Sequence, residues 1–220
     1  MNSWHIAGRY DFSIPEAQKL SDLAGIDVDL DAVIRICARC VAKAKEIAWP
    51  TEDSRDIRWY EELQSLGDLS FAAVVRYGRT FGSGTRSGIP AAWISTLPEA
   101  LRDDHAYFKA LRDKYVAHSV NELEDNQVFV LLKPQIGEHQ EATSITVDRG
   151  RLVGIDPLKL ETLSELASAL KGMVVDAIDV ETEMLLTVAR SMRVEDIRAR
   201  GTYSSPLPDK AATFKVRKKF

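Results

Sequence analysis

One arginine and one histidine near the middle of the chain are the residue types best suited to chemistry at a phosphate ester. Arg112 and Asp113 are adjacent, and four residues separate Asp113 from His118. A histidine can donate or accept a proton near neutral pH because its unperturbed pKa is about 6.5. An arginine offers planar, paired donors that fit the oxygens of a phosphate. The segment 112–118 therefore has groups that can bind a phosphate and move a proton beside it.

This segment is predicted to lie late on a helix over residues 98–121. Pro98 suits a first helical turn, and acidic residues follow it, as is favourable at a helix N-terminus. At about 100° per residue, one face of the helix gathers the large apolar side chains: Leu101, Phe108, Leu111, Tyr115 and Val116. Arg112 falls in the middle of this face, and His105 and Ser119 lie on it at either side. Polar groups that break an apolar face in this way mark places where function is expected.

Two interpretations of Arg112 follow from this position. Burying an unpaired arginine is costly, so Arg112 either lines a cleft at the edge of the core or forms an ion pair with a buried carboxylate. In the second case His118 is a histidine near a helix C-terminus, where cations are favoured in any protein. The segment would then be structural rather than catalytic.

The segment Arg112-Asp113-Lys114-Tyr115-Val116-Ala117-His118-Ser119 resembles the active-site motif of the HEPN ribonucleases. That motif has an arginine, a polar residue and then a histidine, late on a helix of a small helical bundle. The resemblance is strong over this helix and loose over the rest of the chain. It is closest to the HEPN proteins of bacterial toxin–antitoxin and abortive-infection systems.

The resemblance implies a metal-independent RNA endonuclease that works as a homodimer, with two copies of the motif facing each other across a cleft. It implies catalytic roles for Arg112, Asp113 and His118, with no metal and no cofactor. Residues that could assist in binding the substrate are Ser119, Asn121, Arg86 and His105. The implied partners are RNA, a second copy of the chain and an antitoxin protein. The alternative is a non-catalytic HEPN-like module for binding or dimerisation.

Two other sets of residues could carry a site. Arg79 and Arg86 flank the glycine-rich segment 82–88, which could cradle a phosphate but lacks the P-loop pattern, and we predict a mobile loop. Cys37 and Cys40 could form a redox or metal pair. Their position within a helical pattern, without further ligands, favours buried free thiols.

The predicted fold is mainly α: an HEPN-like helical bundle with a small antiparallel β hairpin or sheet inserted before a long C-terminal helix. We expect one domain over residues 1–200, with the β insertion at about 126–155, and a basic, flexible tail over 201–220. Apolar periodicity predicts helices at 28–49, 57–81, 98–121 and 158–192. The segment 57–81 could instead form two helices with a break at Gly67. Alternation and β-branched residues predict strands at 127–133 and 143–147, followed by a turn at 148–151.

Composition narrows the class of protein. The chain has 220 residues, 45% of them hydrophobic, with a net charge of −4, so any contact with nucleic acid needs a local basic patch. No apolar run reaches the roughly 20 residues that a membrane helix needs. The first residues lack the pattern of a secretory signal, so we expect a cytoplasmic protein without membrane contact.

Overall fold

The computed structural model describes residues 8–47, 57–82, 85–116, 124–133, 141–151 and 154–202. The described chain is mostly helical, and its three long helices are α1 (Gln18–Glu46), α2 (Ile57–Arg79) and α5 (Pro157–Ser191). The shorter elements are η1 (Pro15–Ala17), α3 (Ala91–Ser95), α4 (Glu99–Leu111), η3 (Arg112–Val116) and α6 (Val194–Arg198). The β insertion consists of β1 (Glu124–Leu132) and β2 (Ala142–Arg151). This arrangement confirms the predicted fold class of helices with a small antiparallel insertion before a long helix.

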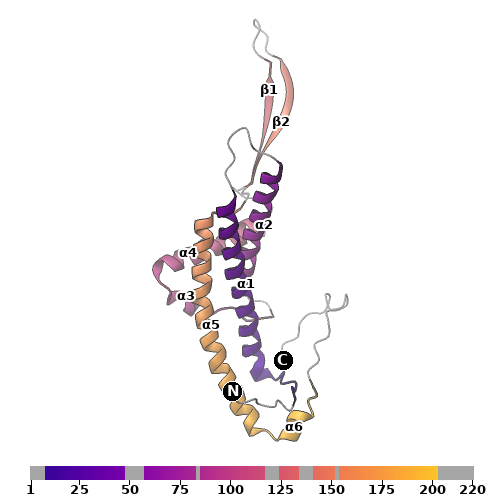
Figure 1. Cartoon of the computed structure of the whole chain (residues 1–220), viewed down its shortest axis with the longest axis vertical. Helices are drawn as coiled ribbons and strands as arrows, with labels where there is room; N and C mark the ends of the chain where they lie inside the picture. Colours follow the sequence, from indigo (N-terminus) through magenta and orange to yellow (C-terminus); the bar gives the residue numbers. More distant parts are fainter. Residues whose placement is uncertain are drawn as a thin grey trace.

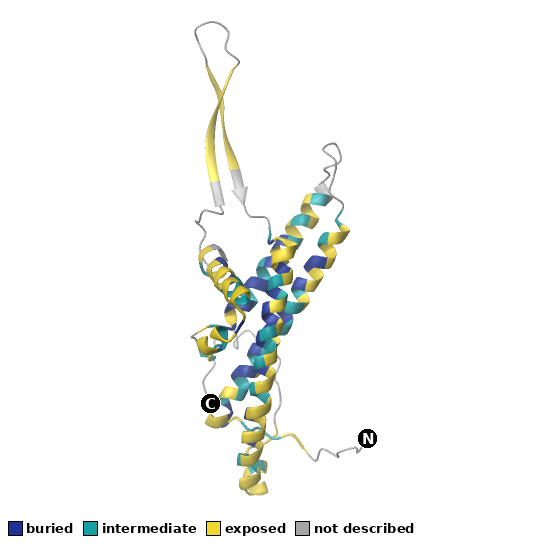
Figure 2. Cartoon of the chain, turned by 90° about the vertical axis from the view of Figure 1, so that its left-hand side faces the viewer, coloured by how far each residue is buried: buried dark blue, intermediate teal, exposed yellow. Residues whose placement is uncertain are grey.

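The three long helices run side by side, and α4 packs across α2 and α5 (Figure 1). The buried residues follow the middle of this bundle, as the dark blue segments of Figure 2 show. Leu30 and Val33 of α1 belong to the same apolar cluster as Leu163 and Leu166 of α5. Phe108 and Leu111 join the same cluster, so the apolar face of α4 is buried within its own chain.

The two cysteines lie inside this cluster. Cys37 and Cys40 are both fully buried and both free, as the sequence predicted. Burial raises the pKa of the Cys37 thiol to about 12, with the neighbouring Cys40 adding to the shift. Both cysteines therefore act as small apolar residues of the core.

One of the long helices begins well before its predicted range. Helix α1 begins at Gln18 rather than at residue 28, directly after η1, which opens with Pro15. The buried stripe of Leu23, Ile26 and Leu30 carries the helical pattern back through this region. Helix α2 is continuous through Gly67, and α5 matches its predicted range closely.

The β insertion is a two-stranded antiparallel hairpin whose second strand is longer than predicted. Residues 148–151 do not form a turn, because they continue β2 and pair with β1, Asp148 with Gln127 and Arg151 with Glu124. Pairing along the whole of β1 therefore overrides the local turn preference of this stretch. The hairpin projects beyond the end of the helices (Figures 1 and 2), and residues 126–133 and 141–148 are all exposed.

The two ends of the described chain meet beside α6. Tyr10 forms an isolated β-bridge with Thr202, and the backbone nitrogen of Asp11 donates to the carbonyl of Gly201. The predicted basic tail falls largely on residues 203–220, which lie outside the described residues. No helix among the described residues combines the length and the apolar character needed to cross a bilayer.

Candidate active site

Arg112 and Asp113 lie together in solvent at the end of α4. The Nη1 atom of Arg112 donates to the Oδ1 atom of Asp113 over 2.7 Å, and the two side chains are 44% and 45% exposed. The structural interpretation of Arg112 required a buried carboxylate as its partner. Asp113 is half exposed and does not meet this requirement. Ion pairs as exposed as this one contribute at most about 1 kcal/mol to stability.

The stem of Arg112 is fixed by a close approach to α2 at Gly78. A Cβ atom at Gly78 would lie 2.7 Å from Cγ and 3.0 Å from Cδ of Arg112, closer than packed atoms allow. Only glycine leaves this space for the aliphatic stem, while the guanidinium at its end stays partly in water. The packing thus positions a cationic head group without removing it from solvent.

A change of helix type begins at Arg112. After Leu111 the chain continues as a π-helix over Arg112–Val116. Single turns of π-helix are rare and occur frequently at functional sites. Of the apolar face predicted for 98–121, Phe108 and Leu111 are buried, and the side chains of Tyr115 and Val116 lie outside the described part of the chain.

His105 makes an interior contact rather than facing an open site. Its Nδ1 atom lies 2.7 Å from the hydroxyl of the fully buried Tyr77, and its ring packs edge-on against Phe81. Burial, with a smaller effect from the nearby Lys109, lowers the pKa of His105. The predicted role of His105 in substrate binding has no support in this geometry, which instead joins α4 to α2.

We expect the stability of the protein in acid to depend on His105. Because the folded state lowers the pKa of His105 below its ordinary value of 6.5, the unfolded chain binds a proton more readily. The stabilising effect of neutral His105 is present above pH 6.5 and is lost as the pH falls through the lowered pKa of the folded state. Thermal melts between about pH 8 and pH 5 should therefore show a smaller loss of melting temperature for His105→Gln than for the parent protein. Equal losses would contradict this role.

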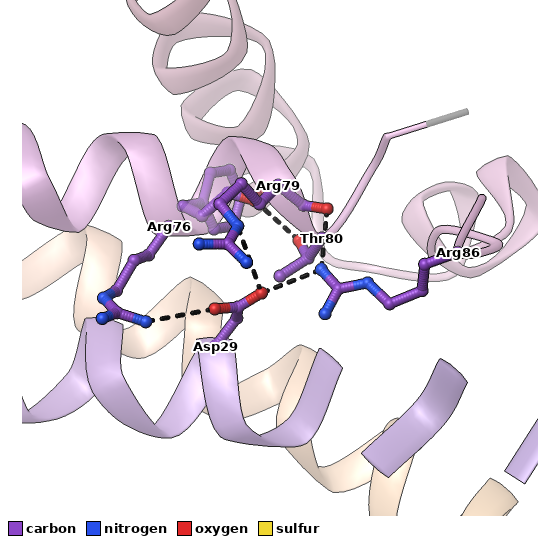
Figure 3. A network of polar contacts seen from close by, with 6 residues as sticks. Asp29, Arg76, Arg79, Thr80 and Arg86 are labelled. Carbon is purple, nitrogen blue, oxygen red and sulfur yellow. Dashed lines mark hydrogen bonds and ion pairs between the residues drawn. The ribbon is translucent and has the colours of Figure 1, made fainter. Parts of the chain in front are cut away.

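A second polar cluster lies between α1, α2 and the segment after α2 (Figure 3). The carboxylate of Asp29, only 5% exposed, accepts hydrogen bonds from Arg76 at 3.2 Å and from Arg86 at 2.8 Å. The guanidinium of Arg79 lies 3.7 Å from the same carboxylate. Three cations from two segments thus converge on one buried anion of α1, a geometry that holds these segments together.

Arg86 is fixed by this cluster and is not directed at the Arg112 segment. Its Nη2 atom also donates to the carbonyl of Arg79, and its side chain is only 18% exposed. Nearby, the backbone nitrogen of Ser87 donates to the carboxylate of Asp22, which is buried as well. Arg86 therefore has an anchoring role in the described structure, and its contact with substrate stays a prediction. Arg86 and Ser87 thus tie the described residues 85–88 to α1, while the mobility predicted for the segment 82–88 stays a prediction.

The sequence contained a signal for this cluster. Asp22 and Asp29 fall on the same stripe of α1 as Ile26 and Val33, so two carboxylates interrupt an apolar face. The signal was missed because a helix starting at residue 28 makes Asp29 a first-turn residue that suits the helix dipole. With the true start at Gln18, the same residue is a charge in the interior of a bundle.

Several predicted site residues fall on the part of the chain that the structure does not describe. His118, Ser119 and Asn121 lie outside the described residues, so their distances to Arg112 and Asp113 are not part of the geometry above. Among the described residues, no three histidine, cysteine, aspartate or glutamate side chains gather as metal ligands would. Surface hollows between α1 and α2, and between α1 and α5, are lined by none of the predicted site residues.

Comparison with known proteins adds no relative. No protein-family model matches the chain, and neither a curated protein nor a solved structure matches it.

Proposed function

We propose that this chain is a metal-independent RNA endonuclease of HEPN type that acts as a bacterial toxin or phage-defence component. The observation that supports the proposal best is the presentation of Arg112. Its stem is fixed against Gly78, its guanidinium is half exposed, and the motif that continues to His118 begins there in a π turn. An arginine held in this way can bind a phosphate at little cost in side-chain ordering.

The proposed reaction needs one phosphate-binding group and two proton transfers. The 2′-oxygen of RNA attacks the adjacent phosphorus and gives its proton to a base. The bond from phosphorus to the 5′-oxygen breaks, and an acid protonates that oxygen. We assign the proton transfers to His118 of two copies of the chain and the stabilisation of charge on the phosphate to Arg112. Asp113, which accepts a hydrogen bond from Arg112, orients the guanidinium in this scheme.

A second candidate function is a non-catalytic module for binding or dimerisation. The exposed β1–β2 hairpin favours this alternative, because apolar side chains on a projecting hairpin are typical of a contact surface. In that case Arg112 and Asp113 form an ordinary surface ion pair.

The two candidates differ in a cleavage assay. As a nuclease, the purified chain should cut single-stranded RNA in the presence of EDTA, because attack by the 2′-oxygen needs no divalent cation. DNA of the same sequence should stay intact, because it lacks the attacking group. RNA cleavage that stops on chelation and returns with magnesium would contradict the proposed chemistry. No cleavage of any RNA would favour the binding module.

A further inference from the structure

Arg76 and Arg79 present unused hydrogen-bond donors to solvent beside the buried carboxylate of Asp29. Arg76 donates to this carboxylate from Nη1 alone, and Arg79 approaches it through Nε at 3.7 Å, which is too long for a hydrogen bond. Neither guanidinium has a further hydrogen bond or ion pair within the described part of the chain. Their side chains are 42% and 57% exposed, so the remaining N–H groups can reach a ligand in solvent.

The cluster carries more positive charge than its carboxylates balance. Arg76, Arg79 and Arg86 lie 3.2, 3.7 and 2.8 Å from the one carboxylate of Asp29, so two positive charges remain unbalanced there. Asp22 is also buried, but it lies two turns earlier on α1, about 10 Å along the helix axis, and accepts from neutral groups. Guanidiniums that share one carboxylate repel each other, so the cluster favours a bound anion.

The buried carboxylate holds the cationic groups in place before any ligand arrives. Figure 3 shows that Arg76 and Arg86 reach Asp29 from opposite sides, with Arg79 between them. Arg76 and Arg79 are three residues apart on α2 and therefore lie on the same face of this helix. Side chains that are already oriented lose less conformational freedom on binding, which favours affinity.

We propose that Arg76 and Arg79 bind a phosphate group, as inorganic phosphate or as a phosphate monoester, with Asp29 orienting them from below. Such a group carries nearly two negative charges at neutral pH, and its oxygens point in several directions. It can therefore accept from two guanidiniums that approach from different sides and offset both unbalanced charges. A carboxylate has two oxygens in one plane, which a single guanidinium already satisfies. The site contains no residue of the Arg112 segment, so the inference holds whether or not the chain cleaves RNA.

The test is an NMR titration of the isotope-labelled full chain with sodium phosphate, at neutral pH and constant ionic strength. The Nε–H signals of Arg76 and Arg79 should shift together and saturate. Two charge-assisted contacts correspond to a dissociation constant on the order of 1 mM. Sodium acetate at equal concentration should shift the same signals much less than phosphate does. No saturable shift up to about 50 mM phosphate, or an equal response to acetate, would contradict the phosphate site.

Substitutions assign the binding to these two arginines. Arg76→Gln/Arg79→Gln should lose measurable binding. The matched control Arg35→Gln/Arg193→Gln removes two charges from exposed ion pairs elsewhere and should bind phosphate like the parent. Arg112→Ala should also bind like the parent. Binding that survives in Arg76→Gln/Arg79→Gln, or that is lost in the control or in Arg112→Ala, would overturn the proposal.

A single substitution gives an answer even if the double variant unfolds. Arg79 makes no hydrogen bond to Asp29, so Arg79→Gln leaves the buried carboxylate with both of its arginine donors. We expect the dissociation constant for phosphate to rise about 10-fold, as the loss of one charge-assisted contact implies. An Arg79→Gln variant that binds phosphate as tightly as the parent would exclude Arg79 from the site.

Discussion

Replacement of Arg112 by alanine is expected to lower the rate of RNA cleavage by about 10²–10³-fold while the protein stays folded. The loss in rate follows from removing the group that we assign to the phosphate. The fold should persist because Arg112 is half exposed and its partner Asp113 is equally exposed, so no buried charge is left behind. We expect the free energy of unfolding to change by less than about 1 kcal/mol. Cleavage rates measured beside thermal melts separate the two effects.

Three further variants sharpen this prediction. His118→Ala should lower the rate by about 10²–10⁴-fold, as loss of a general acid or base does. Gly78→Ala should also slow cleavage, because its Cβ would displace the stem of Arg112 while alanine itself favours the helix. Arg35→Ala removes a more exposed arginine, which is likewise paired with an aspartate, Asp31 on α1, and should leave the rate unchanged. An Arg112→Ala variant as active as the parent would exclude Arg112 from the site.

Replacement of Asp29 by asparagine should have the largest effect on stability, a loss of about 3 kcal/mol in the free energy of unfolding. Removing one partner of a buried ion pair costs about 3–5 kcal/mol, because the remaining charge is left uncompensated. We expect a loss at the lower end of this range, because the side chains of Arg76 and Arg79 are exposed enough to reorient toward solvent. The largely buried Arg86 cannot do so. Urea denaturation followed by circular dichroism measures the change.

The matched control is Asp31→Asn on the same helix. Asp31 also accepts from an arginine, Arg35 at 3.0 Å, but its side chain is 48% exposed. Its replacement should therefore destabilise the protein much less than that of Asp29. Similar losses for the two variants would show that burial of Asp29 does not govern the strength of the cluster.

Long periodic elements were predictable from the sequence, and contacts between elements were not. The apolar stripes of α2 and α5 gave nearly correct ranges because each helix buries one continuous face. The start of α1 was missed because Asp22 interrupts its stripe and Asp29 suits a first helical turn, while their partners Ser87 and Arg86 come from a distant segment. The extension of β2 to Arg151 was missed for a related reason, since pairing with β1 outweighs the local preference for a turn.

Two charges break apolar faces, but the sequence pattern pointed to only one of them. Arg112 falls in the middle of a predicted helix, whereas the predicted helix start at residue 28 made Asp29 an ordinary first-turn residue. In the structure, Asp29 lies in mid-helix and is buried under three arginines, whereas Arg112 lies at a helix end where the chain changes to a π turn. The close approach of Arg112 to Gly78 is a contact between two helices, and the periodicity of one helix contains no information about it.

The chemical form of the RNA ends tests the central claim most directly. Attack by the 2′-oxygen leaves a 2′,3′-cyclic phosphate on one fragment and a 5′-hydroxyl on the other. Attack by water activated at a metal ion instead leaves a phosphate monoester on one fragment and a hydroxyl on the other, without a cyclic phosphate. Mass spectrometry of fragments made by the parent protein in EDTA, with Arg112→Ala as the blank for contaminating nucleases, reads these ends. We predict cyclic phosphate and 5′-hydroxyl ends that are absent from the Arg112→Ala reaction. A 3′-hydroxyl with a 5′-phosphate, or identical fragments from both proteins, would contradict the assignment of this chain as an HEPN-type ribonuclease.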